Sequence, residues 1–378
     1  MTREPRQFGF GMLVLLVMSV VLPGQSSTSS QAIALQQQGK FVEAEKAWRD
    51  VVSQNPRDAA AFASLGVVLS RQEKYAQAAT AYRTALSLNP HLPGIPLNLG
   101  LAEFKQGHFK AAIPALKSAV ASDSGSSQAS MLLGMSYYGA KRFAEAKSIL
   151  QPLAQAEPAN LELGQVLAQS CLAAKDYSCA QVEFGKILRQ NPSSAAAHIL
   201  MGEALDGLHE TDQAIAEFKA AESLEPRRPD LHFGLGYLYW KSHDYDNAER
   251  EFETELNMNA KSTQALTYLG DTKLKRNQLE QAASSLEKAI SLGTDVRLAY
   301  LDMGEVEIQR KRYPAAAKSL SRAVQMDPSQ PDAHYRLGRV YQAMGNKDMA
   351  QQEFAKTREL HQKQDEAVNL KISVPERK

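Results

Sequence analysis

Small and apolar residues recur along the chain at fixed offsets, with a period of 34 residues. Residues 59–92 show the pattern most clearly, because their apolar positions follow one face of a helix on each side of a turn predicted at 72–74. Pro90 closes the second segment, since proline cannot donate the next helical hydrogen bond. The pattern predicts two antiparallel helices joined by a tight turn.

This unit is repeated ten times over 25–364 without an insertion or deletion. Positions are numbered here within each repeat, with Ala59 as position 1 of repeat two. Position 20 is alanine in all ten repeats and position 8 is glycine in eight, the exceptions being Ala32 and Ala168. Position 24 is always large and apolar: Trp48, Tyr82, Leu116, Leu150, Phe184, Phe218, Phe252, Leu286, Leu320 and Phe354.

The alternation of small and large residues has a packing reason. A small residue on each helix lets two backbones approach closely, and the bulky residue fills the space beside it. One helix pair cannot bury both of its faces alone, so each pair must stack on its neighbours. The sequence therefore predicts one continuous all-α array.

Position 32 is proline in six repeats: Pro56, Pro90, Pro158, Pro192, Pro226 and Pro328. With the small and large positions described above, this makes the repeat resemble the tetratricopeptide repeat family. The resemblance covers 25–364. It implies a right-handed superhelical α-solenoid of helix-turn-helix repeats. It also implies that the first helix of each repeat lines a concave groove in which partners bind.

The N-terminal residues do not follow the repeat. Arg3 and Arg6 precede an apolar run over 8–22, and Pro23 follows it. This order is typical of a secretory signal peptide, which we place at 1–24, and it predicts an exported protein, periplasmic or extracellular. An uncleaved N-terminal membrane anchor and a cytoplasmic protein are the alternatives. Beyond the repeats, 365–378 is expected to extend the last helix and to end in a disordered tail.

Composition excludes several classes of function. The formal net charge is +1 with charges of mixed sign, which argues against a nucleic-acid partner, because that requires a basic stripe. No catalytic triad, phosphate loop or metal-binding motif is present, and the segments outside the repeats are too short for an active site. We therefore expect no enzyme activity, no cofactor and no metal. His198, His232 and His334 share position 4 and are interpreted as structural.

Cys171 and Cys179 are the only cysteines, and they lie eight residues apart on either side of the turn in repeat five. Facing helices bring such positions close enough for a disulfide if the side chains converge. Export to an oxidising compartment favours this candidate disulfide. Two buried thiols, or a redox-active pair, are the alternatives.

A second stripe on the first helices, at positions 2, 5, 9 and 12, carries the candidate binding residues. It is small or polar in most repeats, but large and apolar in repeats three, four and seven, and large exposed apolar groups mark interaction sites. The alternative is burial against the second helices of the same repeats. The candidate groove residues are Leu97, Leu101, Phe104, Met131, Met135, Tyr138, Phe233, Tyr237, Trp240 and the adjacent Lys241.

The hypothesis that follows is a non-catalytic interaction scaffold of the cell envelope, which binds a peptide or helical segment of a partner protein in its groove. The alternative is an assembly subunit of a membrane-associated complex for export or outer-membrane biogenesis. Self-association through the terminal repeats is a further option. The sequence does not identify the partner.

Overall fold

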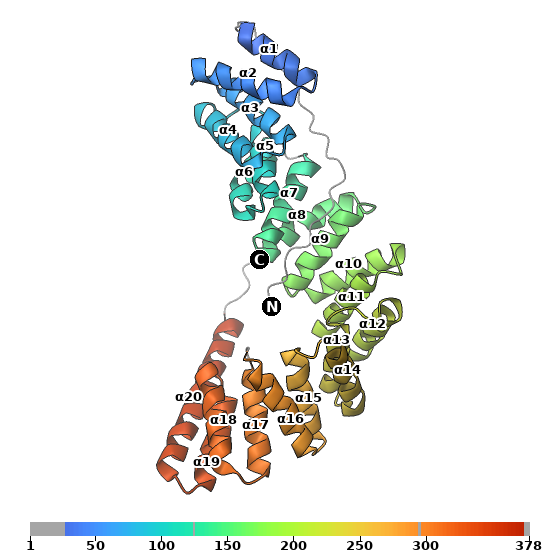
Figure 1. The fold of residues 1–378 in the computed structure, drawn as a ribbon, viewed down its shortest axis with the longest axis vertical. Coiled ribbons are helices and arrows are strands. Elements are labelled where there is room, and N and C mark those ends of the chain that lie inside the picture. Colours follow the sequence, from blue (N-terminus) through green and yellow to red (C-terminus); the bar gives the residue numbers. More distant parts are fainter. Residues whose placement is uncertain (1–26, 124, 294–295, 374–378) are drawn as a thin grey trace. The chain divides into compact units, whose positions relative to one another are not determined.

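The computed structural model describes residues 27–123, 125–293 and 296–373, and every regular element in these ranges is a helix (Figure 1). The helices form two compact units, which divide between Gln190 and Asn191. Unit 1 contains α1 (Ser27–Gln37), α2 (Phe41–Gln54), α3 (Ala59–Arg71), α4 (Tyr75–Leu88), α5 (Ile95–Lys105), α6 (Phe109–Ser122), α7 (Ser127–Gly139), α8 (Phe143–Ala156), α9 (Leu161–Ala173) and α10 (Tyr177–Gln190). Unit 2 contains α11 (Ala195–Gly207), α12 (Thr211–Leu224), α13 (Leu231–Lys241), α14 (Tyr245–Met258), α15 (Thr263–Lys275), α16 (Leu279–Ser291), α17 (Arg297–Gln309), α18 (Tyr313–Met326), α19 (Pro331–Ala343) and α20 (Lys347–Ser373).

The expected all-α solenoid of tandem helix pairs is confirmed. Odd-numbered helices are the first helices of the repeats and even-numbered helices are the second. The proposed signal peptide at 1–24 and the last residues, 374–378, lie outside the described residues. Among the helices that the structure describes, none combines the length and apolar character needed to cross a bilayer.

Among the described residues, the first helices of five repeats begin with a side-chain cap. In repeat two, the Asp58 carboxylate caps α3 by accepting a hydrogen bond from the backbone N–H of Ala61 at 2.9 Å. Ser126, Asn160, Ser194 and Ser262 cap the first helices of later repeats in the same way. The predicted turn at 72–74 lies between α3 and α4. The hairpin boundaries thus follow from short-range sequence.

The glycine at position 8 lies directly against the large residue at position 24. A Cβ added to Gly100 would be 2.4 Å from Leu116 Cγ, and one added to Gly236 would be 2.8 Å from the ring of Phe252. Leu116 and Phe252 are fully buried, and so are the position-20 alanines of the same two repeats, Ala112 and Ala248. The predicted pairing of small and large residues is confirmed, and it sets how closely the two helices of a repeat approach.

The turn inside every repeat places position 15 in the left-handed region of backbone conformation. Only Gly39, Gly107 and Gly345 are glycines there. The other seven turns use a residue with a side chain: Glu73, Lys141, Lys175, His209, His243, Asn277 and Lys311. Because that conformation crowds a Cβ, each of these turns holds some backbone strain.

The first helices lie closer to their counterparts in the next repeat than the second helices do. In unit 1, α3 contacts α5, α5 contacts α7 and α7 contacts α9; in unit 2, α13 contacts α15 and α15 contacts α17. Second helices of adjacent repeats make no comparable contacts in the described part of the chain. Within each unit the first helices therefore line the inner side of the stack, which we call the first-helix face.

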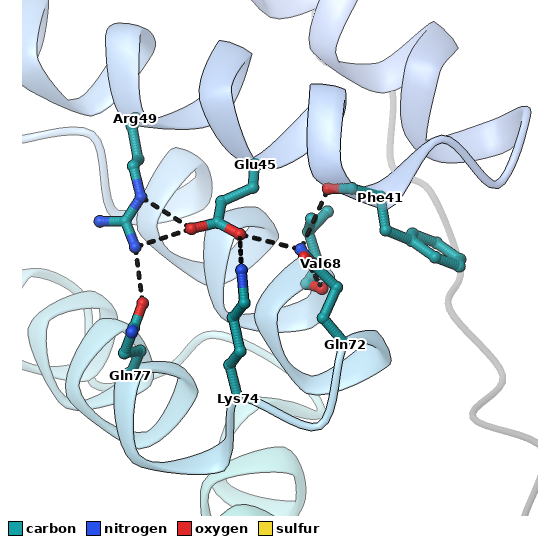
Figure 2. Close-up of polar contacts among 7 residues, drawn as sticks. All are labelled: Phe41, Glu45, Arg49, Val68, Gln72, Lys74 and Gln77. Carbon is teal, nitrogen blue, oxygen red and sulfur yellow. Dashed lines mark hydrogen bonds and ion pairs between the residues drawn. The ribbon is translucent and has the colours of Figure 1, made fainter.

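Polar contacts also join neighbouring repeats, as Figure 2 shows for repeats one and two. Glu45 on α2 accepts hydrogen bonds from Lys74 Nζ at 2.7 Å and from Gln72 Nε2 at 3.0 Å, both in the turn of the next repeat. Arg49 bonds Glu45 at 3.0 Å and Gln77 at 2.7 Å. The hydrogen bond from Lys74 is the main cause that lowers the pKa of Glu45, which favours its ionised form. These contacts fix the register of adjacent repeats.

Candidate functional site

Four aromatic side chains gather on the first-helix face of unit 2, and we call them the aromatic cluster. Phe233, Tyr237 and Trp240 lie on α13, and Tyr268 lies on α15. The Tyr268 ring is edge-on to Trp240 at 5.1 Å between centroids, to Tyr237 at 5.5 Å and to Phe233 at 5.8 Å, while Tyr237 stacks on Trp240 at 5.8 Å. All four are half-buried. The cluster is held in place by its own contacts and still presents part of each ring to solvent.

Buried carboxylates border the aromatic cluster. The Trp240 indole Nε1–H donates to Asp271 Oδ2 at 2.5 Å. Asp302 on α17 is 3% exposed, and its Oδ2 has no hydrogen-bond partner among the described residues. Burial and then the charge of Asp271 raise the pKa of Asp302 well above its usual value. Burial is also the main cause that raises the pKa of Tyr268, followed by Tyr237 and the two aspartates. This edge of the cluster therefore contains two carboxyl groups that are largely shielded from water.

Lys241, the candidate charged residue beside the cluster, has a partner within its own unit. Its Nζ lies 2.6 Å from Asp206 Oδ1 on α11, and both side chains are partly buried. The pair links the first helices of repeats six and seven. Lys241 therefore contributes to the shape of the first-helix face, with its charge already paired.

The candidate residues of unit 1 present less surface. Leu101 is 8% exposed and Met135 is 4% exposed, so the expectation that these two offer an open binding surface is wrong. They are buried because α5 and α7 lie in contact on the first-helix face. Leu97 and Met131 are half-buried.

The two aromatic candidates of unit 1 are half-buried and pack within their own repeats. Phe104 lies 5.4 Å from Phe109, and Tyr138 lies 5.6 Å from Phe143, measured between ring centroids. Both contacts are with the first residue of the following second helix. Packing inside the repeat therefore accounts for Phe104 and Tyr138, as contact between α5 and α7 accounts for Leu101 and Met135.

The candidate disulfide is present, with Cys171 on α9 bonded to Cys179 on α10 and a Cα–Cα separation of 5.7 Å. It closes the hairpin of repeat five across its turn. A covalent link here constrains the unfolded chain in addition to the helix packing.

Two residues of the site were not anticipated from the stripe. Tyr268 is at position 6, off the chosen positions, and reaches the cluster because α15 contacts α13. Asp271 is at position 9 and belongs to the stripe, but it is not one of the large apolar side chains that mark the candidate residues. Its signal in the sequence is a carboxylate on the same face as the Trp240 indole, which needs a hydrogen-bond acceptor when buried.

The repeats also match models of known protein families. Family models described as "Tetratricopeptide repeat" match residues 30–93, 199–265, 69–135, 103–170, 137–204 and 332–363, and one described as "TPR repeat" matches 304–345. The matches together cover more than half of the chain. A search of curated protein sequences finds no match.

Several solved structures are similar to this chain. The crystal structure of the APC/C hetero-tetramer Cut9–Hcn1 shares 13% identity, covers 88% of this chain and 80% of its own, and gives a TM-score of 0.51. The crystal structure of MamA shares 22% identity over 44% of this chain and 97% of its own, with a TM-score of 0.40. YrrB, described as a TPR protein with an unusual peptide-binding site, shares 22% identity over 50% and 97%, with a TM-score of 0.39.

Helix pairs recur with a fixed period, and small and large positions pack them together. These features define a helical-repeat protein. The chain belongs to the tetratricopeptide repeat family.

Proposed function

We propose that this protein is a non-catalytic scaffold of the cell envelope, which binds an extended or helical segment of a partner protein on the first-helix face of unit 2. The observation that carries the proposal is the aromatic cluster. Its four rings are ordered by mutual contacts before any partner arrives, so little side-chain freedom is lost on binding. Tyrosine and tryptophan in such a setting are the side chains that most often dominate binding energy at interfaces.

Tyr237→Ala is expected to reduce partner recovery from an envelope extract by at least about tenfold, as for a central interface anchor. Tyr237 suits the test better than Trp240, because the Trp240 indole also bonds the buried Asp271. Quantitative crosslinking and mass spectrometry would compare the variant with the wild-type protein, and circular dichroism would check the helical content.

Tyr245→Ala is the matched control, since Tyr245 is a half-buried tyrosine of the same repeat that lies on the second helix, α14. It should leave partner recovery unchanged. Equal recovery with both variants and the wild type would rule out the aromatic cluster as the binding site.

The location in the envelope rests on the N-terminal sequence and is supported by the disulfide between Cys171 and Cys179, a bond typical of exported proteins. The full-length chain expressed in a bacterium should appear in the periplasmic or extracellular fraction, with residues 1–24 removed. Intact-mass measurement and N-terminal sequencing would show this. A variant that lacks 8–22 should stay in the cytoplasm.

Recovery of the full-length chain with the membranes, its first residues intact, would instead favour an anchored assembly subunit. Recovery of uncleaved protein in the cytoplasm would contradict an envelope role.

A further inference from the structure

One histidine and two glutamates from three successive helices converge inside unit 2. They are Glu222 on α12, His232 on α13 and Glu251 on α14. His232 Nδ1 lies 2.8 Å from Glu251 Oε2 and 3.9 Å from Glu222 Oε1, and one atom of each residue lies within 4.8 Å of the others. The side chains of His232 and Glu251 are buried, while that of Glu222 is 36% exposed.

The other ring nitrogen of His232 determines which atom faces the carboxylates. Nε2 lies 2.9 Å from the backbone carbonyl oxygen of Pro226, which can only accept a hydrogen bond, so Nε2 carries a hydrogen. Nδ1 is therefore the atom directed at the two carboxylates. A metal-binding histidine is usually oriented in this way, with its second N–H donated to a carbonyl.

Two other repeats contain the same histidine arrangement without the second carboxylate. His198 Nδ1 lies 2.6 Å from Glu217 and His334 Nδ1 lies 2.6 Å from Glu353, and in both the Nε2 faces a proline carbonyl. The position that Glu222 occupies relative to His232 is Leu188 before His198 and Val324 before His334. A hydrogen bond between the histidine and one glutamate explains those two sites. Glu222 is the feature particular to repeat seven.

The surroundings of His232 carry an excess of negative charge. Glu255, one turn further along α14, is 2% exposed, interacts electrostatically with His232 and leaves its Oε2 without a partner among the described residues. Asp230 lies at the start of α13 and adds to the negative charge around Glu255. Cations also lie near: Arg250 Nε is 3.7 Å from Glu251 Oε1, and Lys219 interacts electrostatically with Glu222. Burial raises the pKa of Glu255 and so reduces its negative charge, but a bound cation would still offset the carboxylates of Glu222 and Glu251 better than the single charge of an imidazolium.

We propose that Glu222, His232 and Glu251 form a zinc site, with Nδ1 of the histidine and one oxygen of each carboxylate as ligands. Zinc bonds to nitrogen and oxygen are about 2.0–2.2 Å long, which places tetrahedral ligand atoms roughly 3.3 Å apart. The distances of 2.8 and 3.9 Å from Nδ1 bracket that value. An imidazole ligand favours zinc over magnesium or calcium. The exposed side of Glu222 gives the ion access and leaves room for a water as the fourth ligand.

The site would tie together α12, α13 and α14, and so would fix the junction between repeats six and seven. It is independent of the binding face proposed above. Zinc must displace a proton from Nδ1. Burial is the largest single influence and acts to lower the pKa of His232, but the hydrogen bonds with Glu251 and Pro226 and the charges of Glu251 and Glu222 together outweigh it, so the net shift is upward. Binding is therefore best measured at about pH 8, where fewer protons compete.

The test is isothermal titration of zinc chloride into the untagged, chelator-treated protein, with thermal unfolding recorded in parallel. We expect one specific site per chain and a rise in unfolding temperature. Glu222→Gln, a conservative change at the exposed ligand, should weaken zinc binding by at least about tenfold. X-ray absorption should report one histidine and oxygen ligands around the metal.

Glu217→Gln is the matched control, because it alters the carboxylate partner of His198 in the equivalent pair of repeat six. It should leave zinc affinity unchanged. The proposal is overturned if the wild-type protein shows no zinc binding, or if Glu222→Gln binds zinc as tightly as the wild type does.

Discussion

Gly100→Ala should lower the free energy of unfolding of unit 1 by about 1–3 kcal/mol, the usual range for overpacking a well-filled core. The added Cβ would be 2.4 Å from Leu116 Cγ, and Leu116 is fully buried between α5 and α6. Leu116→Ala should itself cost about 2–5 kcal/mol, because it leaves a cavity. Urea unfolding followed by circular dichroism would measure both effects.

The double variant identifies the cause of the loss. With alanine at both positions, the new methyl group occupies space that the leucine has vacated, so the combined loss should be smaller than the sum by about 0.5–3 kcal/mol. Gly164→Ala is the control, since Gly164 lies in helix α9 with nothing within 4 Å of an added Cβ. Alanine should stabilise that helix by about 0.5–1 kcal/mol. Equal effects of Gly100→Ala and Gly164→Ala would contradict the pairing of small and large residues.

Asp302→Asn should stabilise unit 2 at neutral pH by about 1–3 kcal/mol, the order of the desolvation penalty of a buried group, because asparagine cannot ionise in this buried site. Burial and Asp271 raise the pKa of Asp302 above its unfolded value of 3.8. The folded state therefore holds this proton more tightly than the unfolded state does. Its contribution to stability is present at pH values below 3.8 and is lost as the pH rises above that value towards the raised pKa. Asparagine stays neutral and removes this loss.

Unfolding by urea at pH 4 and pH 7.5 would measure the pH dependence. The advantage of Asp302→Asn should be large at pH 7.5 and small at pH 4. Asp327→Asn is the control from the same repeat, because the hydrogen bonds from Ser329 lower the pKa of this aspartate. Loss of that carboxylate should not stabilise the protein at pH 7.5. A gain from Asp302→Asn that is equal at both pH values would show that ionisation of Asp302 is not the cause.

The repeat period was sufficient to predict the helices and the contacts within a hairpin. Both depend on offsets of a few residues along one chain, so Gly100 and Leu116 could be paired from sequence alone. The exposure of the first-helix face was harder to predict, because it depends on which side chains the neighbouring first helices bring to that face. Leu101 and Met135 are buried, whereas Tyr237, at the equivalent position 9, is half-buried.

Polar contacts between helices were the other feature that could not be predicted fully from the sequence. His232 and Glu251 are 19 residues apart, as are the members of the two related pairs, so their spacing was visible in the sequence. The third group, Glu222, comes from the preceding repeat, and only the stacking of repeats brings it near. The 34-residue period therefore predicts which backbone positions come together in such a site, but not which of them carry a charged side chain.

The seven turns that place a side-chain-bearing residue at a left-handed backbone position have a consequence for engineering. Glycine adopts that conformation without crowding, and Gly39, Gly107 and Gly345 already do so. Replacing any of these seven residues with glycine would relieve backbone strain, so the protein could be made more stable at seven turns along the chain. Each bend could be changed separately, as at the exposed Lys141 and Lys311, whereas His243 also hydrogen-bonds Tyr245 on α14.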